Sequence, residues 1–256
     1  MPRIALVTGA NQGVGYQVAK ALAENGATVY LGSRDFNKGE KAAKELSAIP
    51  IQIDITDAVS ITAAAARIRE EQGRLDLLVN NAGISNTRRA AASKDELADP
   101  NWLAEYARSS KASTASLEEM RAVWDVNVFG TLAVYQAMLP LLREGVDARI
   151  VNVSSGVGSL TTNADPSYPY HSIYGPIYPA SKAAENAVTL AIMVELEGTD
   201  IKVNLVSPAF TATNLNNFAG TETVEDGSRE VIRVALLGPD GPTGTFTRWE
   251  NTHIPW

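Results

Sequence analysis

Two side chains four positions apart, Tyr178 and Lys182 in the run 176-PIYPASKAAE-185, are suited to proton transfer. Positions i and i+4 of a helix lie on one face, so the two groups are neighbours if this run is helical. A free phenol has a pKa of about 10, which is too high for efficient acid–base work near neutrality. A nearby ammonium stabilises the phenolate, so we expect Lys182 to lower the pKa of Tyr178.

The same pair also has a plainer interpretation. Pro179 fits the first turn of a helix, so Tyr178 could simply begin that helix. Lys182 would then be a solvated side chain. Taken alone, the spacing favours this plainer interpretation, and a decision needs residues from elsewhere in the chain.

A glycine-rich turn near the start of the chain is the second chemical signal. The apolar run 3-RIALVT-8 leads into 8-TGANQGVG-15 and then into a helical pattern. Such a turn brings backbone N–H groups and a helix N-terminus to a pyrophosphate. Gly9 permits the sharp turn, and Gly13 and Gly15 remove side chains that would block the phosphate or the helix–strand contact. Glycine-rich turns also occur without ligands, but this position favours a dinucleotide site.

The end of the next apolar run, 29-VYLGSRD-35, bears on which dinucleotide is bound. A carboxylate there would bind the ribose 2′-OH of NAD, whereas an arginine accommodates the 2′-phosphate of NADP. Ser33 stands where the acid is expected and Arg34 follows, so NADP(H) is favoured over NAD(H). Asp35 weakens the local positive field, and Arg34 could also be an ordinary solvated residue.

The elements that must position these residues alternate along the chain. Near-continuous apolar strands separated by helices are typical of a parallel sheet covered on both sides. The sequence predicts an α/β chain whose residues 1–256 form one domain, a Rossmann-type doubly wound parallel sheet of about seven strands with helices on both faces. The strands are expected at 3–8, 27–32, 50–55, 74–80, 148–154, 201–207 and 244–249. The helices are expected near 14–25, 37–48, 59–72, 117–143 and 178–197.

Two stretches interrupt this alternation. Residues 84–116 are small, polar and charged, with a short helix expected around 101–108, and residues 156–177 are rich in Pro, Tyr, Ser and Gly. Long connections in a compact domain are functional lids or surface insertions, and both interpretations stay open. Aromatic residues in them fit either an apolar carbonyl substrate or loop anchoring; these are Tyr168, Tyr170, Tyr174 and Trp102.

Composition excludes several classes of function. The 22 Lys and Arg against 29 Asp and Glu give a net charge of −7, which argues against nucleic acid or an anionic membrane as partner. There is no Cys and there are only two His, so we expect no metal site and no thiol chemistry. The apolar runs 4-IALV-7 and 188-VTLAIMV-194 are too short for a signal peptide or a membrane span, so we expect a cytoplasmic protein without a membrane partner.

The combination of motifs resembles the short-chain dehydrogenase/reductase family over essentially the whole chain. The motifs, in the family's order, are 8-TGANQGVG-15, 80-NNAG-83, Asn127, 151-VNVSS-155 and 178-YPASK-182. The resemblance implies a catalytic tetrad of Asn127, Ser155, Tyr178 and Lys182. It implies that Tyr178 protonates the alkoxide, Ser155 holds the substrate oxygen, Lys182 also binds the nicotinamide ribose, and Asn127 orders a water that relays protons to Lys182.

The resemblance also implies further cofactor contacts. Asp54 and Ile55 should meet the adenine, and Asn81 and Gly83 should line the ribose, although 80-NNAG-83 can also serve to stabilise the sheet. Thr211 and Thr213 should contact the nicotinamide end and its phosphates. The full expected set is Gly9, Asn11, Gln12, Gly13, Val14, Gly15, Ser33, Arg34, Asp54, Ile55, Asn81, Ala82, Gly83, Tyr178, Lys182, Pro208, Thr211 and Thr213.

The chain departs from the family pattern in three places. Pro208-Ala209 stands where the family usually has Pro-Gly, so Ala209 replaces a glycine. Either the backbone has a negative φ there or the nicotinamide-side loop is shifted. Gln12 replaces the basic residue of many NADP-preferring relatives, which leaves Arg34 alone to select NADP. The connection from Ser155 to Tyr178 resembles, in milder form, the insertion of monomeric carbonyl reductases, so monomer, dimer and tetramer all stay open.

We therefore expect an NADPH-dependent carbonyl reductase that interconverts a small-molecule ketone or aldehyde with its alcohol. A same-fold enzyme of another reaction, such as an epimerase, a dehydratase or a dehalogenase, is an alternative. A non-catalytic NADP-sensing protein is a second alternative, which the complete Asn, Ser, Tyr and Lys set disfavours.

Overall fold

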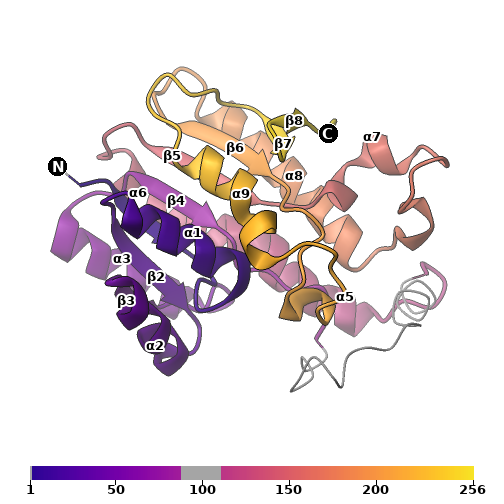
Figure 1. Cartoon of the computed structure of the whole chain (residues 1–256), viewed down its shortest axis with the longest axis horizontal. Helices are drawn as coiled ribbons and strands as arrows, with labels where there is room; N and C mark the ends of the chain where they lie inside the picture. The colour runs from indigo at the N-terminus through magenta and orange to yellow at the C-terminus, as the bar shows by residue number, and fades with distance from the viewer. Residues whose placement is uncertain (1, 88–110) are drawn as a thin grey trace.

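One mostly parallel sheet forms the centre of the molecule in the computed structural model, which describes residues 2–87 and 111–256 (Figure 1). The eight strands lie in the order β3-β2-β1-β4-β5-β6-β7-β8, and only the last pair is antiparallel. Their bounds are β1 Ile4–Val7, β2 Thr28–Ser33, β3 Ile49–Gln52, β4 Leu77–Asn80, β5 Arg149–Val153, β6 Lys202–Val206, β7 Phe246–Arg248 and β8 Thr252–His253.

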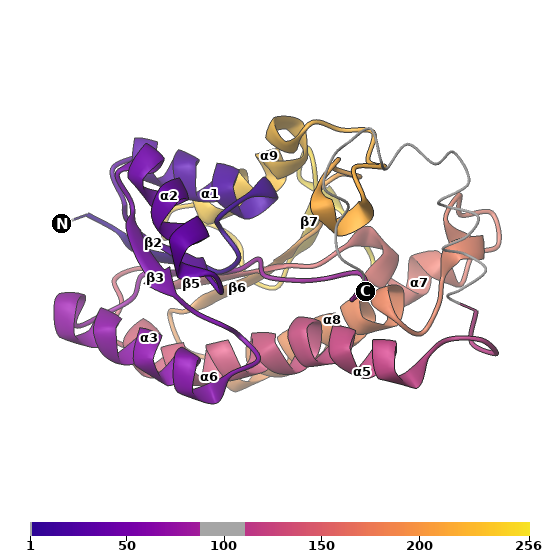
Figure 2. The same ribbon diagram turned by 90° about the horizontal axis from the view of Figure 1, so that it is seen from below.

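Helices cover both faces of the sheet, so its central strands are buried on both sides. Helices α1, α2 and α9 lie on one face, and α3, α6 and α8 lie on the other (Figure 2). The alternation of side chains shows this division, since Ile4 and Leu6 belong to one core cluster and Ala5 and Val7 to the other. The helices are α1 Gly13–Glu24, α2 Phe36–Leu46, α3 Ala58–Gln72, α5 Leu117–Trp124, α6 Thr131–Leu142, α7 Leu160–Asn163, α8 Tyr178–Glu195 and α9 Val224–Ala235.

The expected single-domain α/β fold is confirmed, with three differences in its elements. The long helix expected over 117–143 contains a π-helical segment, η1 Asp125–Gly130, between α5 and α6. Helix α9 and the short strand β8 were not predicted. The short helix expected around 101–108, and Trp102 with it, lie outside the described residues.

Helix α9 was missed although its sequence has an apolar stripe, a capping residue at Thr223 and acidic residues in its first turn. Gly227 lies inside the helix because a Cβ there would overlap the side chain of Thr211. Val231, Val234 and Ala235 are fully buried against the sheet. Packing on the sheet and α1 therefore stabilises a helix that local propensity predicts weakly.

One helical run among the described residues, Leu117–Leu142, is long and apolar enough to cross a membrane by length and composition alone. In this structure 56% of its apolar window is buried inside the protein. The run packs against α3 and α8 and covers one face of the sheet (Figure 2). Burial of this kind is the behaviour of a core helix.

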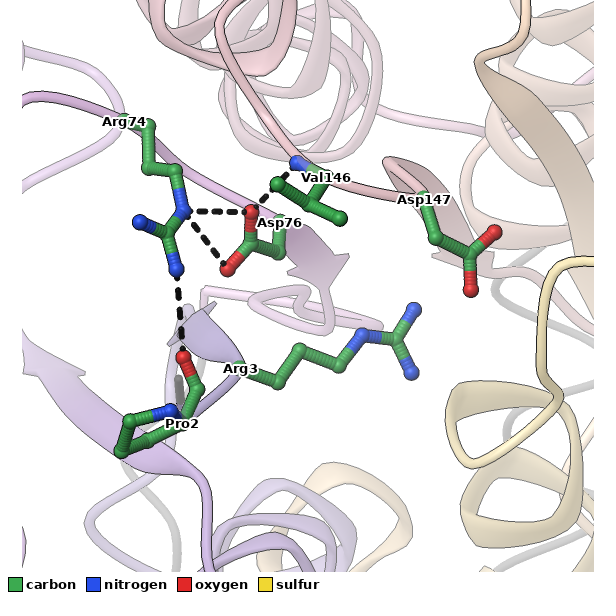
Figure 3. A pocket seen from close by; sticks show the side chains of 6 residues that line it. All are labelled: Pro2, Arg3, Arg74, Asp76, Val146 and Asp147. Carbon is green, nitrogen blue, oxygen red and sulfur yellow. Dashed lines mark hydrogen bonds and ion pairs between the residues drawn. The ribbon is translucent and has the colours of Figure 1, made fainter.

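A surface hollow lies at the amino-terminal edge of the sheet (Figure 3). The buried Asp76 carboxylate accepts hydrogen bonds from the backbone N–H of Ile4 at 2.8 Å and of Val146 at 2.7 Å. It also pairs with Arg74 at 3.0 Å. These contacts join the starts of β1, β4 and β5, so the cluster holds the sheet together at the edge opposite the carboxyl ends of the strands.

Replacement of Asp76 by Ala should lower the free energy of unfolding by about 3 kcal/mol, because the buried Ile4 N–H, the part-buried Val146 N–H and the Arg74 guanidinium lose their partner. Urea denaturation measures this loss. The matched change Asp200→Ala removes an exposed aspartate, and it should alter stability by less than about 0.5 kcal/mol. An equal effect of the two changes would contradict the role assigned to Asp76.

Candidate functional site

Most of the residues selected from the sequence meet at the carboxyl-terminal edge of the sheet. The strands β1, β4, β5 and β6 are parallel neighbours, so the turns that follow them converge at one edge. In open α/β sheets this edge is where ligands bind. The glycine turn follows β1, Asn81 follows β4, Ser155 follows β5, and Pro208 follows β6.

The glycine turn has the geometry of a phosphate cradle. Gly9 and Gly13 both have φ of +63°, a conformation that other residues rarely adopt. Helix α1 begins at Gly13, and its N-cap, Gln12, makes no side-chain capping hydrogen bond. The first turn of α1 contains no acidic residue. Its N–H groups and the positive end of the helix dipole therefore suit an anion, which fits a dinucleotide pyrophosphate.

Asn81 and Ala82 hold this turn in shape. The Asn81 side chain donates to the carbonyls of Thr8 at 2.9 Å and Gly9 at 3.1 Å. The backbone N–H groups of Asn81 and Ala82 both donate to the Thr8 hydroxyl. The 80-NNAG-83 motif thus stabilises the glycine turn. This is the structural role that the sequence left open in addition to the expected ribose contact.

Gly15 and Val14 begin the helix that follows the turn. A Cβ on Gly15 would overlap the Asn81 amide and lie 2.8 Å from the Gly9 carbonyl oxygen. The glycine is therefore needed for contact between α1 and the end of β4. Val14 turns its side chain into the core, which leaves its backbone as the part available to a phosphate, and Asn11 lies in the turn before it, half-buried.

The end of β2 presents an exposed cation beside a buried serine. Arg34 is exposed, whereas the Ser33 hydroxyl donates to the Asp35 carbonyl at 2.8 Å. The Asp35 carboxylate caps α2 by accepting the Lys38 N–H and lies 3.8 Å from the Lys38 ammonium. Within the described part of the chain, the Arg34 guanidinium has no such partner, so Asp35 is engaged elsewhere and Arg34 can meet a ligand phosphate.

Asp54 and Ile55, the residues expected at the adenine, lie just after β3. One Asp54 carboxylate oxygen, Oδ1, accepts hydrogen bonds from the N–H and the hydroxyl of Thr56. Ile55 is buried in the core cluster, where a Cβ on Gly130 would lie 2.9 Å from it. Both therefore shape the loop at this edge of the sheet.

The two serines after β5 have different surroundings. Ser154 is buried and its hydroxyl bonds to Asn186 at 2.5 Å. Ser155 is half-buried and lies near enough to the Tyr178 phenol to lower the pKa of that group. The geometry thus brings Ser155, and not Ser154, to the phenol of Tyr178.

Lys182 lies almost fully buried one turn after Tyr178 on α8. Its ammonium donates to the Val153 carbonyl at 2.9 Å and to the Glu185 carboxylate at 2.7 Å. Burial alone would lower the pKa of Lys182, but Glu185 and Tyr178 raise it overall. Lys182 is therefore not the solvated side chain that the plainer interpretation requires.

Burial raises the pKa of Tyr178, while Lys182 and the hydrogen bond with Ser155 lower it by less, and Glu185 raises it further. The sequence anticipated the contribution of Lys182 but neither the burial nor Glu185. The contribution of Lys182 therefore has the expected direction, but burial and Glu185 outweigh it.

Asn127 lies in the π-helical segment, a feature that is frequent at functional sites. Its side chain donates to the Ile84 carbonyl at 2.8 Å and to the Ser181 hydroxyl at 3.0 Å, and its Oδ1 accepts the Ile84 N–H. A Cβ on Gly83 would lie 3.2 Å from this Oδ1 and 3.6 Å from Lys182 Nζ. Asn127 therefore joins the loop after β4 to the Lys182 region.

The loop after β6 closes over the glycine turn. Thr213 lies 3.6 Å from the position of a Cβ on Gly13, and Asn214 donates to the Gln12 side chain at 3.1 Å. Thr211 is buried, and its hydroxyl donates to the Ala209 carbonyl at 2.8 Å. Thr213 is thus beside the turn, whereas the Thr211 side chain bonds within its own loop.

Ala209 fits this loop without strain, because it is not among the described residues that have a positive φ. The first alternative for Ala209, a negative φ, therefore applies. Ser207 and Pro208 precede it, and the Ser207 hydroxyl accepts the Gly156 N–H at 2.8 Å. This bond joins the loop after β6 to the turn that carries Ser155.

An aromatic cluster borders the Ser155 turn. Tyr168 and Tyr170 pack edge to face with centroids 5.6 Å apart, and Tyr170 lies 6.3 Å from Phe210. The Tyr168 hydroxyl would lie 3.9 Å from a Cβ on Gly156. Phe210 was not selected from the sequence; its place one residue after Ala209 at the end of β6 could have indicated it.

Comparison with known proteins agrees with this geometry. The family model for short chain dehydrogenases matches residues 3–223, and the chain belongs to the short-chain dehydrogenase/reductase family. The chain is 36% identical to the short-chain dehydrogenase anuI of Penicillium roqueforti, over 98% of this chain and 96% of that one. It is 30% identical to salutaridine reductase of Papaver somniferum, over 95% and 93% of the two chains.

Solved structures share the fold. The structure of salutaridine reductase from Papaver somniferum superposes with a TM-score of 0.77 at 29% identity, covering 95% of this chain and 99% of that chain. The NADPH-bound carbonyl reductase from chicken fatty liver also gives a TM-score of 0.77, at 26% identity, covering 100% and 99%. The chain is thus an oxidoreductase of this family, whose relatives include reductases of small molecules and bind nicotinamide cofactors.

The contact between Gly15 and Asn81 can be tested by stability. Gly15→Ala should lower the free energy of unfolding by about 2 kcal/mol, because the added methyl overlaps the Asn81 amide. The control, Gly238→Ala, places its methyl where no atom lies within 4 Å and should leave stability unchanged or raise it slightly. Urea denaturation of both variants decides, and equal midpoints would contradict the tight contact.

Proposed function

We propose that the protein is an NADPH-dependent carbonyl reductase that interconverts a ketone or aldehyde with its alcohol, with Tyr178 as general acid and base. The observation that carries the proposal is the placement of Tyr178 one helical turn before a buried Lys182 ammonium, with Ser155 near the phenol. This arrangement combines a proton donor, a group to hold a carbonyl oxygen and a fixed positive charge.

NADP(H), when bound, supplies or accepts the hydride. The residues of the chain position the carbonyl and move its proton. The Ser155 hydroxyl holds the substrate oxygen, and the Tyr178 hydroxyl gives its proton to that oxygen as negative charge develops on it. Lys182 stabilises the phenolate that remains. Asn127, next to Lys182 and the loop after β4, orders the water that returns the proton.

The proposed cofactor contacts follow the same edge of the sheet. The uncapped N-terminus of α1 receives the pyrophosphate, and Arg34 receives the 2′-phosphate that distinguishes NADP from NAD. Asp54 and Ile55 face the adenine, Asn81 and Gly83 the ribose, and Pro208 and Thr213 the nicotinamide end. Thr211 acts through the shape of its loop, since its hydroxyl is bonded to Ala209.

The aromatic cluster of Tyr168, Tyr170 and Phe210 supports a bulky apolar ketone as substrate. It lies at the turn that carries Ser155, so it can hold rings against the reacting carbonyl. Relatives of the chain include proteins named salutaridine reductase and (+)-neomenthol dehydrogenase. A cytoplasmic location stays a prediction.

The alternatives make different predictions for the same assay. An epimerase, a dehydratase or an NADP-sensing protein of this fold would not oxidise NADPH when supplied with carbonyl compounds. Loss of absorbance at 340 nm with a panel of aryl ketones, cyclic ketones, ketoesters and aldehydes separates them from a carbonyl reductase.

The change Tyr178→Phe removes the proposed proton donor and should lower kcat for ketone reduction by a factor of about 10² to 10⁴, while NADPH still binds. Fluorescence titration of NADPH and the 340-nm assay measure the two effects. The control, Tyr30→Phe, removes a hydroxyl on β2 that is bonded to Glu71 of α3. It should leave kcat unchanged. Near-normal reduction by the Tyr178 variant would overturn the mechanism.

The choice of cofactor rests on Arg34. Replacement of Arg34 by Ala should reduce the ratio of kcat/KM for NADPH to that for NADH by about 10- to 100-fold, because a charge-assisted phosphate contact is lost. The control, Lys44→Ala, removes an exposed cation on α2 and should leave the ratio unchanged. A ratio that is the same in the wild type and the Arg34 variant would exclude Arg34 as the selector.

A further inference from the structure

Glu185 is a buried carboxylate that none of the motifs includes. It lies three positions after Lys182 on α8 and is 1% exposed. Its Oε2 is 2.7 Å from Lys182 Nζ, and both side chains are almost completely shielded from solvent. The pair is therefore an internal ion pair next to the proposed proton donor.

Packing alone does not account for a carboxylate at this position. Removing a charged group from water costs several kcal/mol, and an apolar side chain of similar volume would fill the same space without that cost. Among the residues that the structure describes, the Lys182 ammonium is the one partner that compensates the carboxylate. Its effect on the site must therefore act through Lys182.

The ammonium of Lys182 has three N–H donors, and the structure accounts for two of them. One is directed to the Val153 carbonyl at the end of β5 and one to Glu185. Nζ also lies close to Gly83, 3.6 Å from the position of a Cβ there. Glu185 therefore fixes the direction of the ammonium and leaves one donor for the side of the site that faces the loop after β4.

We propose that Glu185 is a positioning residue that holds the Lys182 ammonium against β5 and offsets part of its positive charge at Tyr178. The inference rests on the proposed function for the catalytic meaning of that charge. The coupling of Glu185 to Tyr178 through Lys182 depends only on residues of this chain.

The groups that face Tyr178 and Lys182 make the sign of the effect clear. From α8 itself they are Lys182 and Glu185, and from the turn after β5 it is the neutral Ser155. Asn127 of the π-helical segment and Gly83 after β4 bring no charge. Among the described residues, Lys182 and Glu185 are thus the charged groups that act on Tyr178.

Loss of the carboxylate should lower the pKa of Tyr178. A negative charge disfavours the phenolate, so its removal favours ionisation. We expect the pKa of Tyr178 to fall by about one unit. Reduction requires the protonated phenol. The alkaline limb of the pH profile of kcat/KM for reduction should therefore move to lower pH by the same amount, and oxidation should gain activity at lower pH.

Direct titration of Tyr178 tests the coupling without any turnover. The protein is labelled with [ζ-¹³C]tyrosine, and the Tyr178 signal is assigned by its disappearance in Tyr178→Phe. The variants compared are wild type, Glu185→Gln and Glu185→Asp. The pKa of Tyr178 should fall by about one unit in Glu185→Gln and stay close to the wild-type value in Glu185→Asp, which keeps the charge.

The matched control is Glu230→Gln on α9. Glu230 is also 1% exposed and also forms an i,i+3 ion pair, with Arg233 at 2.6 Å, but it lies outside the site. It should lower stability without moving the titration of Tyr178. If Glu185→Gln does not fold, Glu185→Leu carries the same measurement, because an apolar side chain replaces the buried charge.

The outcomes separate this inference from the proposed function. An unchanged Tyr178 titration in the folded Glu185 variants overturns the inference, even if the protein reduces ketones. A lowered Tyr178 pKa supports it, even if no carbonyl compound is turned over, in which case only the proposed function fails. A shift of equal size in Glu230→Gln would show a general loss of structure and would also overturn the inference.

Discussion

The buried ammonium of Lys182 is the interaction on which the site depends. It joins the end of β5, through the Val153 carbonyl, to α8, through Glu185. A charge removed from water in this way is stable only while its partners stay in place. The position of Tyr178, one turn earlier on the same helix, is therefore fixed by the same contacts that compensate the charge.

A second constraint is the contact between the glycine turn and the end of β4. Asn81 bonds to Thr8 and Gly9, and Gly15 leaves room for its amide. The turn is consequently held open toward the carboxyl edge of the sheet with its helix N-terminus uncapped. The proposed phosphate site and the strand packing use the same residues, so a change that disturbs the packing should also disturb the site.

Much of the fold followed from local patterns. Fully apolar strands separated by helices predict a doubly wound parallel sheet, and Gly9 and Gly13 both adopt the positive φ that the sharp turn requires. Of the elements that were missed, β8 has only two residues, too few for a periodic pattern. Helix α9 contains Gly227, which is required by Thr211, and its stability comes from packing on the sheet and α1. The π-helical segment around Asn127 is likewise set by its surroundings, which include Ile84 and Ser181.

The sequence by itself determined the fold class, the glycine turn, the order of the motifs and the helical spacing of Tyr178 and Lys182, because each depends on residues near one another in the chain. Only the tertiary structure decided whether Ala209 is strained and in which direction the pKa of Tyr178 moves. Burial and the Glu185 charge govern that direction, and both depend on segments that come together only when the sheet and α8 pack. The acidity of Tyr178 is thus a property of the packed environment, not of the Tyr–Lys spacing alone.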